Sequence, residues 1–195
     1  MVMVQVHKAM LSRGIKLSRT PEFGSVAPAT PTVNSLPLRR ADFASLADAL
    51  DYAAQGVTGA NFYAGSGKLA TVLSYRLLRE QALVLARRLL SLPLERGARV
   101  AIVAETNPDF LRFFFACQYA GLVPVALPAS VNLGGHDAYV ARLRGLLQGC
   151  GASVAMASSQ FLRFLREAAE GVDLAFAGTP AAFDALPEQD VPLRS

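Results

Sequence analysis

The chain contains 195 residues, of which 52% are hydrophobic and 17% are charged. A chain of this composition can bury one sizeable core, so disorder throughout its length is excluded. The formal net charge of +4 would indicate a nucleic-acid partner only if the basic residues gathered on the folded part.

The basic excess lies in the first 40 residues, which carry six Lys and Arg side chains against Glu22 alone, a net charge of +5. Residues 41–195 therefore carry a net charge of −1. A near-neutral body lacks the basic surface that binding along a phosphate backbone requires. We expect no nucleic acid among the partners.

Residues 1–40 are predicted to form a basic, proline-containing leader or linker. The first 20 residues contain serine and lack acids, which is also typical of a mitochondrial transit peptide. We favour a disordered leader, either natural or derived from cloning, because composition over so few residues is a weak signal for targeting; Glu22 to Ser25 also has the sequence of a cloning junction.

The folded part is expected to start near Ala41 with a helix over residues 45–54, for which Ser45 is the predicted N-cap. Two short runs rich in β-formers follow, at residues 61–63 and 68–73. Because glycines join the two runs, they are predicted to pair as an antiparallel hairpin.

From residue 75 onward, helical patterns alternate with short apolar runs. Helices are predicted over residues 75–92, 107–121, 137–151 and 159–171, and strands over residues 99–105, 122–128, 153–158 and 174–178. Buried strands separated by helices of this length indicate βαβ units. The predicted fold class is therefore α/β, a mostly parallel sheet with helices on both faces, plus the antiparallel hairpin near the start.

Polar residues just before the apolar stripes mark the expected helix starts. The predicted caps are Ser74, Asn107 followed by Pro108, His136 or Asp137, and Ser158 or Ser159. Gly121, Gly149 and Gly151 are the predicted helix ends. The whole domain is predicted to cover residues 41–180, with a polar tail over residues 181–195.

Two features were tested as phosphate-binding loops. The glycine–lysine sequence in the hairpin resembles the end of a P-loop, but Phe62 stands where the first glycine is required, and Leu69 where Ser or Thr is required. The turn after the strand at 99–105 contains Asn107 and Pro108 but no glycine, so it lacks the usual pyrophosphate cradle. These residues predict neither P-loop nor NAD binding.

The candidate nucleophiles are Cys117, Ser158 and Ser159. None lies in a G-x-S-x-G elbow or in a helpful histidine context, and Cys117 lies among helical aromatic residues, so we interpret it as a buried structural thiol. Glu105 and Asp109 flank a capping turn, where carboxylates favour a helix N-terminus. They are not predicted to act as a catalytic acid and base.

No metal site is predicted, because the side chains that most often bind metals do not occur at ligand spacing. The histidines and cysteines of the chain are His7, His136, Cys117 and Cys150. Two cysteines in apolar helical surroundings suit a reducing compartment better than a disulfide scaffold. We therefore expect the protein in the cytoplasm.

The most apolar run, residues 110–127, is interrupted by Arg112 and Gln118, so no membrane span is predicted. Aromatic residues in this run could line an acyl tunnel, but packing against the sheet is the default interpretation. These residues are Phe110, Phe113, Phe114, Phe115 and Tyr119.

The stretch from Leu73 to Ala129 resembles the opening region of adenylate-forming enzymes, with a long helix, a strand, and a helix leading into a Gly-x-x-x-Val-x-Leu-like strand. A finer resemblance, to the fatty-acyl-AMP ligases, extends over residues 42–170. It rests on the segments "FASLADALDYAAQG", "NFYAGSGKLATVLSY", "FFFACQYAGLVPVALP" and "GGHDAYVARLRGLLQGCGASVAMAS".

This resemblance implies the N-terminal subdomain of the adenylate-forming fold, within a parent enzyme that uses ATP and Mg²⁺ to activate a fatty acid for transfer to a carrier-protein thiol. The family's nucleotide-binding loop and catalytic lysine are expected beyond Ser195. No residue here is therefore assigned a catalytic, cofactor-binding or metal-binding role, and the chain alone is expected to be inactive.

Three alternatives stay open. The chain could be a fragment of an acyl-CoA or aryl-CoA ligase, a non-catalytic docking module of a polyketide or peptide synthetase, or a standalone nucleotide-binding α/β protein. In each case where the subdomain is excised from a larger protein, exposed apolar surface would favour self-association.

Overall fold

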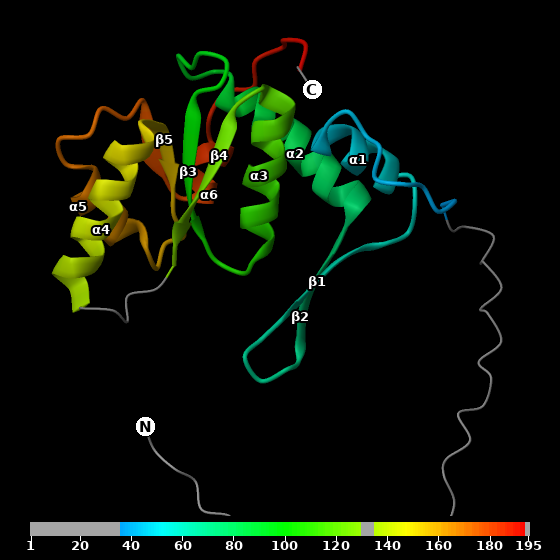
Figure 1. The fold of residues 1–195 in the computed structure, drawn as a ribbon, viewed down its shortest axis with the longest axis horizontal. Helices are drawn as coiled ribbons and strands as arrows, with labels where there is room; N and C mark the ends of the chain where they lie inside the picture. Colours follow the sequence, from blue (N-terminus) through cyan, green and yellow to red (C-terminus); the bar gives the residue numbers. More distant parts are fainter. Residues whose placement is uncertain (1–35, 130–134, 194–195) are drawn as a thin grey trace, which may run out of the picture. The chain divides into compact units, whose positions relative to one another are not determined.

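A computed structural model describes residues 36–129 and 135–193 of the chain (Figure 1). Its helices are α1 (Leu46–Ala53), α2 (Tyr75–Leu89), α3 (Pro108–Ala120), α4 (Gly135–Cys150), α5 (Leu162–Ala169) and α6 (Pro180–Asp184). Its strands are β1 (Gly59–Tyr63), β2 (Leu69–Ser74), β3 (Arg99–Ala104), β4 (Val123–Pro128), β5 (Ala152–Met156) and β6 (Phe176–Gly178).

The four strands β3 to β6 form one sheet in the order β4-β3-β5-β6, and every neighbouring pair in it is parallel. The strands β1 and β2 form a separate antiparallel hairpin. Both features confirm the fold class predicted from the sequence. The first hairpin strand begins at Gly59, two residues earlier than predicted.

Helices cover both faces of the parallel sheet because successive side chains of a strand point to opposite sides. In β3, Val100 and Ile102 belong to one buried cluster, while Ala101 and Val103 belong to another. The first cluster lies against α2, α3 and α6, and the second against α4 and α5 (Figure 1). A strand that is buried on both faces has a continuous apolar run in its sequence, and this run allowed β3 to be predicted.

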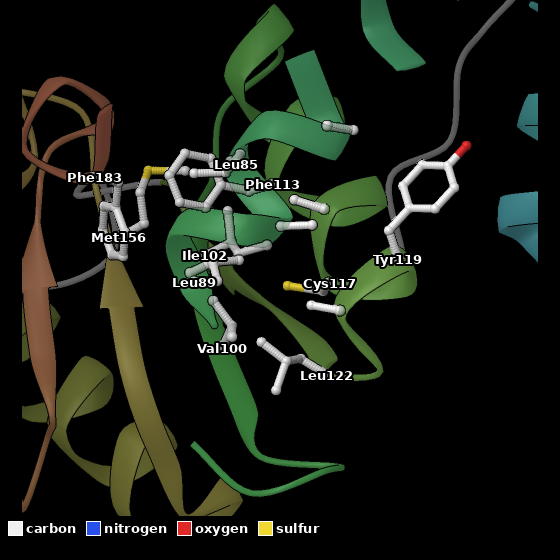
Figure 2. Close-up of a cluster of buried hydrophobic side chains, with 14 of the residues drawn as sticks. Leu85, Leu89, Val100, Ile102, Phe113, Cys117, Tyr119, Leu122, Met156 and Phe183 are labelled. Atoms are coloured by element: carbon white, nitrogen blue, oxygen red, sulfur yellow. The ribbon is translucent and has the colours of Figure 1, made fainter. Parts of the chain in front are cut away.

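The first cluster brings together side chains from α1, α2, α3 and α6 and from β2, β3 and β5, and Figure 2 shows part of it. Phe113 of α3 and Phe183 of α6 are fully buried, and their rings meet edge to face with centroids 5.0 Å apart. Met156 of β5 and Ile102 of β3 form the sheet side of the same cluster (Figure 2). These contacts join α6 to the body of the domain.

A polar contact also joins α1 to α2 and α3. The Tyr119 hydroxyl of α3 donates to a carboxylate oxygen of Asp51 at 2.6 Å, and Arg79 Nε of α2 donates to the same oxygen at 2.6 Å. Burial, and then the Asp51 carboxylate, raise the pKa of Tyr119, so the hydroxyl stays a donor at neutral pH.

Three predicted helix caps are confirmed. The Ser45, Ser74 and Asn107 side chains accept hydrogen bonds from the third backbone N–H beyond each, as N-caps do. Gly121 ends α3 at φ 69°, a left-handed conformation that glycine adopts without a steric cost.

Other predicted boundaries were wrong. Helix α4 already begins at Gly135, so His136 and Asp137 lie inside its first turn. Helix α5 follows Phe161 without any side-chain cap, so neither Ser158 nor Ser159 caps it. Helix α2 ends at Leu89, before the predicted end, because the last residues before Pro93 form turns.

Helix α6 was missed, since residues 181–195 were predicted to be a polar tail. Thr179 caps this short helix by accepting from the Ala182 N–H, with Pro180 at the first helical position. Asp184 at its end pairs with Arg88 of α2 and Arg112 of α3, each at 3.0 Å. The beginning of the predicted tail therefore packs into the domain.

Among the residues that the structure describes, no helix is long and apolar enough to cross a membrane.

The substitution Phe183→Ala is expected to lower the free energy of unfolding by about 3–5 kcal/mol, because it opens a cavity where α6 meets α3. Phe114→Ala removes the same atoms from a partly exposed site on α3 and should cost clearly less. Urea unfolding followed by circular dichroism measures both. Equal losses for the two variants would show that α6 does not contribute to the core.

Candidate functional site

Ligands of open parallel sheets bind outside the carboxyl ends of the strands, where neighbouring strands send their connections to opposite faces. Here β3 leads to α3 on the first face, while its neighbour β5 leads to α5 on the second face. The residues that follow these strands are Glu105 after β3 and Ser158 after β5. This edge is the candidate functional site.

A hydrogen bond spans the candidate site from α4 to the end of β4. The Tyr139 hydroxyl donates to the Pro128 carbonyl oxygen at 2.7 Å. Burial raises the pKa of Tyr139, and the Glu105 carboxylate raises it further. Tyr139 is thus a neutral donor at this edge. Tyr139 could not be identified from the sequence, because its hydrogen bond to Pro128 depends on how α4 packs against β4.

His136 stands at the start of α4 and contacts α5. Its Nε2 lies 2.5 Å from a carboxylate oxygen of Glu167, and its ring centroid lies 4.9 Å from that of Phe164. From the same helix, Arg144 donates to the carbonyl oxygens of Glu167 and Ala168 at the end of α5. These contacts hold the two helices of the second face together.

The two serines at the end of β5 differ in their surroundings. Ser158 Oγ is buried and has no hydrogen-bond partner among the described residues, whereas Ser159 is exposed. A serine nucleophile requires a base within hydrogen-bond reach. Ser158 has none in this structure, so the described residues do not form a Ser–His dyad.

Cys117 is fully buried in the first cluster, as interpreted from the sequence. Burial raises the pKa of its thiol to about 12. Because the thiolate is the nucleophilic form, a thiol that stays protonated inside a core does not react at neutral pH.

The aromatic residues of α3 divide between two environments. Phe113 and Tyr119 are buried in the first cluster. Phe110, Phe114 and Phe115 are only half-buried, and their rings form a chain with centroid separations of 6.2 Å and 5.5 Å. Core packing therefore explains the first two. Phe110 and Phe115 pack against the edge of the same cluster, and together with Phe114 they form a half-exposed aromatic strip on α3.

The hairpin turn and the turn after β3 are the two loops that the sequence raised as possible phosphate cradles. The glycine–lysine sequence forms the hairpin turn, in which the Ala64 N–H donates to the Lys68 carbonyl oxygen at 2.9 Å. The turn after β3 carries Pro108, which has no N–H to offer a phosphate. Between residues 36 and 193, apart from 130–134, no three His, Cys, Asp or Glu side chains gather as metal ligands would.

Asp109 is placed as expected, in the first turn of α3, where it pairs with Arg112 at 3.1 Å. Glu105 lies before the capping residue Asn107. The two carboxylates therefore serve different contacts, one with Arg112 and one near Tyr139.

Comparison with known proteins gives one family. Residues 52–190 match the family described as AMP-binding enzyme. A solved structure from a study of fatty acyl-adenylate ligases of E. coli and L. pneumophila is 43% identical, with a TM-score of 0.77 over 81% of this chain and 28% of that chain. A Caulobacter vibrioides protein assigned as an acyl-CoA synthetase is 43% identical over 78% of this chain and 27% of its own length.

A benzoate CoA ligase from Burkholderia xenovorans LB400 shares the fold at 20% identity, with a TM-score of 0.58 over 78% of this chain and 31% of that chain. The chain spans less than one third of the length of each of these relatives. The likeness to the benzoate enzyme concerns the fold alone.

The substitution Ser158→Ala is expected to leave the free energy of unfolding unchanged or to raise it by about 1 kcal/mol, since the buried hydroxyl makes no hydrogen bond that could be lost. Thr179→Ala, which removes the hydroxyl that caps α6, should instead lower it by about 1 kcal/mol. Chemical unfolding compares the two variants. A larger loss for Ser158→Ala would mean that its hydroxyl has a partner.

In the native chain, a thiol reagent is expected to label Cys150, which is partly exposed, and to spare Cys117. Unfolding in guanidinium chloride should make both thiols reactive. The variant Cys150→Ser serves as the control and should show no fast labelling when folded. Labelling of Cys117 at neutral pH in the native chain would contradict its place in the core.

Proposed function

The chain belongs to the AMP-binding enzyme family, and on this premise we propose that it is the N-terminal part of a ligase that activates a fatty acid with ATP. The observation that carries the proposal is the 43% identity to a structure from a study of fatty acyl-adenylate ligases, at a TM-score of 0.77 over 81% of this chain. Structural relatives at lower identity support only the fold.

The proposed reaction has two steps. A fatty carboxylate attacks the α-phosphate of ATP, which releases pyrophosphate and leaves an acyl-adenylate. The acyl group then passes to the thiol of a carrier protein, and AMP leaves. Such phosphoryl chemistry depends on positioned donors and Mg²⁺ around the phosphates.

This chain is proposed to be the scaffold of that ligase. Its support is that the described residues hold no cluster of three His, Cys, Asp or Glu side chains that could bind a metal ion. The chain also spans less than one third of the relatives' length. We propose that the parts that bind ATP and Mg²⁺ lie in the remainder of the ligase, and that the parallel sheet supports them from its carboxyl edge.

A second candidate acceptor of the acyl group is coenzyme A. It is favoured by the 43% identity to the Caulobacter vibrioides protein assigned as an acyl-CoA synthetase. Both acceptors are thiols, so the first step is the same for both. The difference lies in which thiol takes the acyl group from the adenylate.

Pyrophosphate exchange into ATP tests the first step. The 195-residue chain alone is expected to give no exchange above background with Mg²⁺, ATP and a fatty acid. The ligase produced from the longer reading frame should give exchange that depends on the fatty acid. Exchange by the chain alone, or exchange by the ligase without any carboxylic acid, would overturn the proposal.

The acceptor is identified by incubating the ligase with ATP, a radiolabelled fatty acid, and either coenzyme A or a carrier protein that bears its free thiol group. Transfer to the carrier protein is expected, and the same carrier with its thiol-bearing group removed is the control. Efficient transfer to coenzyme A alone would favour the second candidate.

A further inference from the structure

The hairpin β1–β2 projects away from the four-stranded sheet (Figure 1). One of its faces packs inward, since Leu73 is buried and Phe62 contacts the first cluster. The other face carries Tyr63, Leu69 and Val72, which are 53–59% exposed. A two-stranded hairpin is marginal in water unless further strands join it or it packs against a helix, and here only the inner face has such packing.

Strands at the edge of a sheet attract other strands unless something blocks them. In β4, the Val123 N–H points to β3 and bonds the Ala98 carbonyl oxygen. Because alternate residues of a strand point to the same side, Pro124 and Pro128 face outward, where they offer no N–H. The β4 edge is therefore blocked against strand addition.

The edges of β2 and β6 are also poorly suited to strand addition. Strand β2 carries a bulge, because Ala70 has no partner between the pairs Phe62–Thr71 and Tyr63–Leu69. Strand β6 is only three residues long. Among the described strands, β1 is therefore the one whose edge is suited to strand addition. It is regular and contains no charged residue and no proline.

The pairing of β1 with β2 determines which backbone N–H and C=O groups of β1 point away from β2. The Tyr75 N–H bonds the Thr58 carbonyl oxygen, and the Ala64 N–H bonds the Lys68 carbonyl oxygen. Alternation then places the N–H and C=O groups of the odd-numbered residues, Gly59, Asn61 and Tyr63, on the free edge. This set is symmetric about Asn61.

We propose that β1 pairs antiparallel with β1 of a second copy of this chain, about a two-fold axis at Asn61. Each outward N–H and C=O group then finds its equivalent in the partner. The two hairpins then form one four-stranded antiparallel sheet. A sheet of three or more strands is stable in water where an isolated hairpin is marginal.

The side chains of β1 are complementary to themselves in this register. Gly59 stands opposite Tyr63 of the second copy on the exposed face, and Ala60 stands opposite Phe62 of the second copy on the other face. A small residue thus faces an aromatic ring at every pair other than the central Asn61 pair, and aromatic residues paired with glycine stabilise sheets. No like charges meet, because β1 has none.

Light scattering after gel filtration of the purified chain tests the proposal, and a dimer is expected. Asn61→Lys places two like charges directly opposite each other at the axis and should give a monomer with an unchanged circular dichroism spectrum. Ala70→Lys is the matched control, since it adds the same charge to an exposed position of the same hairpin away from β1, and it should stay a dimer.

Hydrogen exchange gives a second readout that does not depend on a variant. The Gly59, Asn61 and Tyr63 amides should be protected at concentrations where the dimer forms and lose protection on dilution. A monomeric wild-type chain would overturn the proposal and leave this edge for another occupant, such as a strand from the rest of the ligase. A dimer that Asn61→Lys does not weaken would overturn it too.

Discussion

The burial of both faces of the parallel sheet is the constraint on which the rest of the structure depends. The alternation in β3 sends Val100 and Ile102 to one side and Ala101 and Val103 to the other, so two separate helical layers are needed. Polar side chains then lie at strand ends, on outer helix surfaces, or between helices, as Asp51 does with Arg79 and Tyr119. Among the described residues, the side chains that are buried as a whole belong to hydrophobic residues.

This constraint explains which parts of the fold could be predicted from the sequence. Continuous apolar runs gave the buried strands, and the capping residues Ser45, Ser74 and Asn107 gave the helix starts. The short strand over residues 174–178 was predicted, but the short helix that follows it could not be found by periodicity. Helix α6 is only five residues long, and it exists because Phe183 fills the space beside Phe113, a tertiary contact that no local pattern shows.

The candidate site was less predictable than the fold. From the sequence, Glu105 and Ser158 were considered and assigned no role, and Tyr139 was not considered; its hydrogen bond to the Pro128 carbonyl oxygen depends on how α4 packs on the sheet. The aromatic neighbours of Cys117 in the sequence predicted a core thiol, and the burial of Cys117 confirms this prediction. The family follows from the match over residues 52–190, whereas the activity of the whole ligase stays a proposal, because this chain spans less than one third of its relatives.

We propose that the chain is a scaffold that supports acyl-adenylate chemistry in the complete ligase without contacting the nucleotide. A crystal structure of the complete ligase with a bound fatty acyl-adenylate tests this most directly. In that structure, we expect this part of the ligase to have the strand order β4-β3-β5-β6. We expect every residue that contacts the AMP moiety to lie outside residues 1–195. An AMP phosphate held by residues 64–68 of the hairpin, or by the turn after β3, would contradict it.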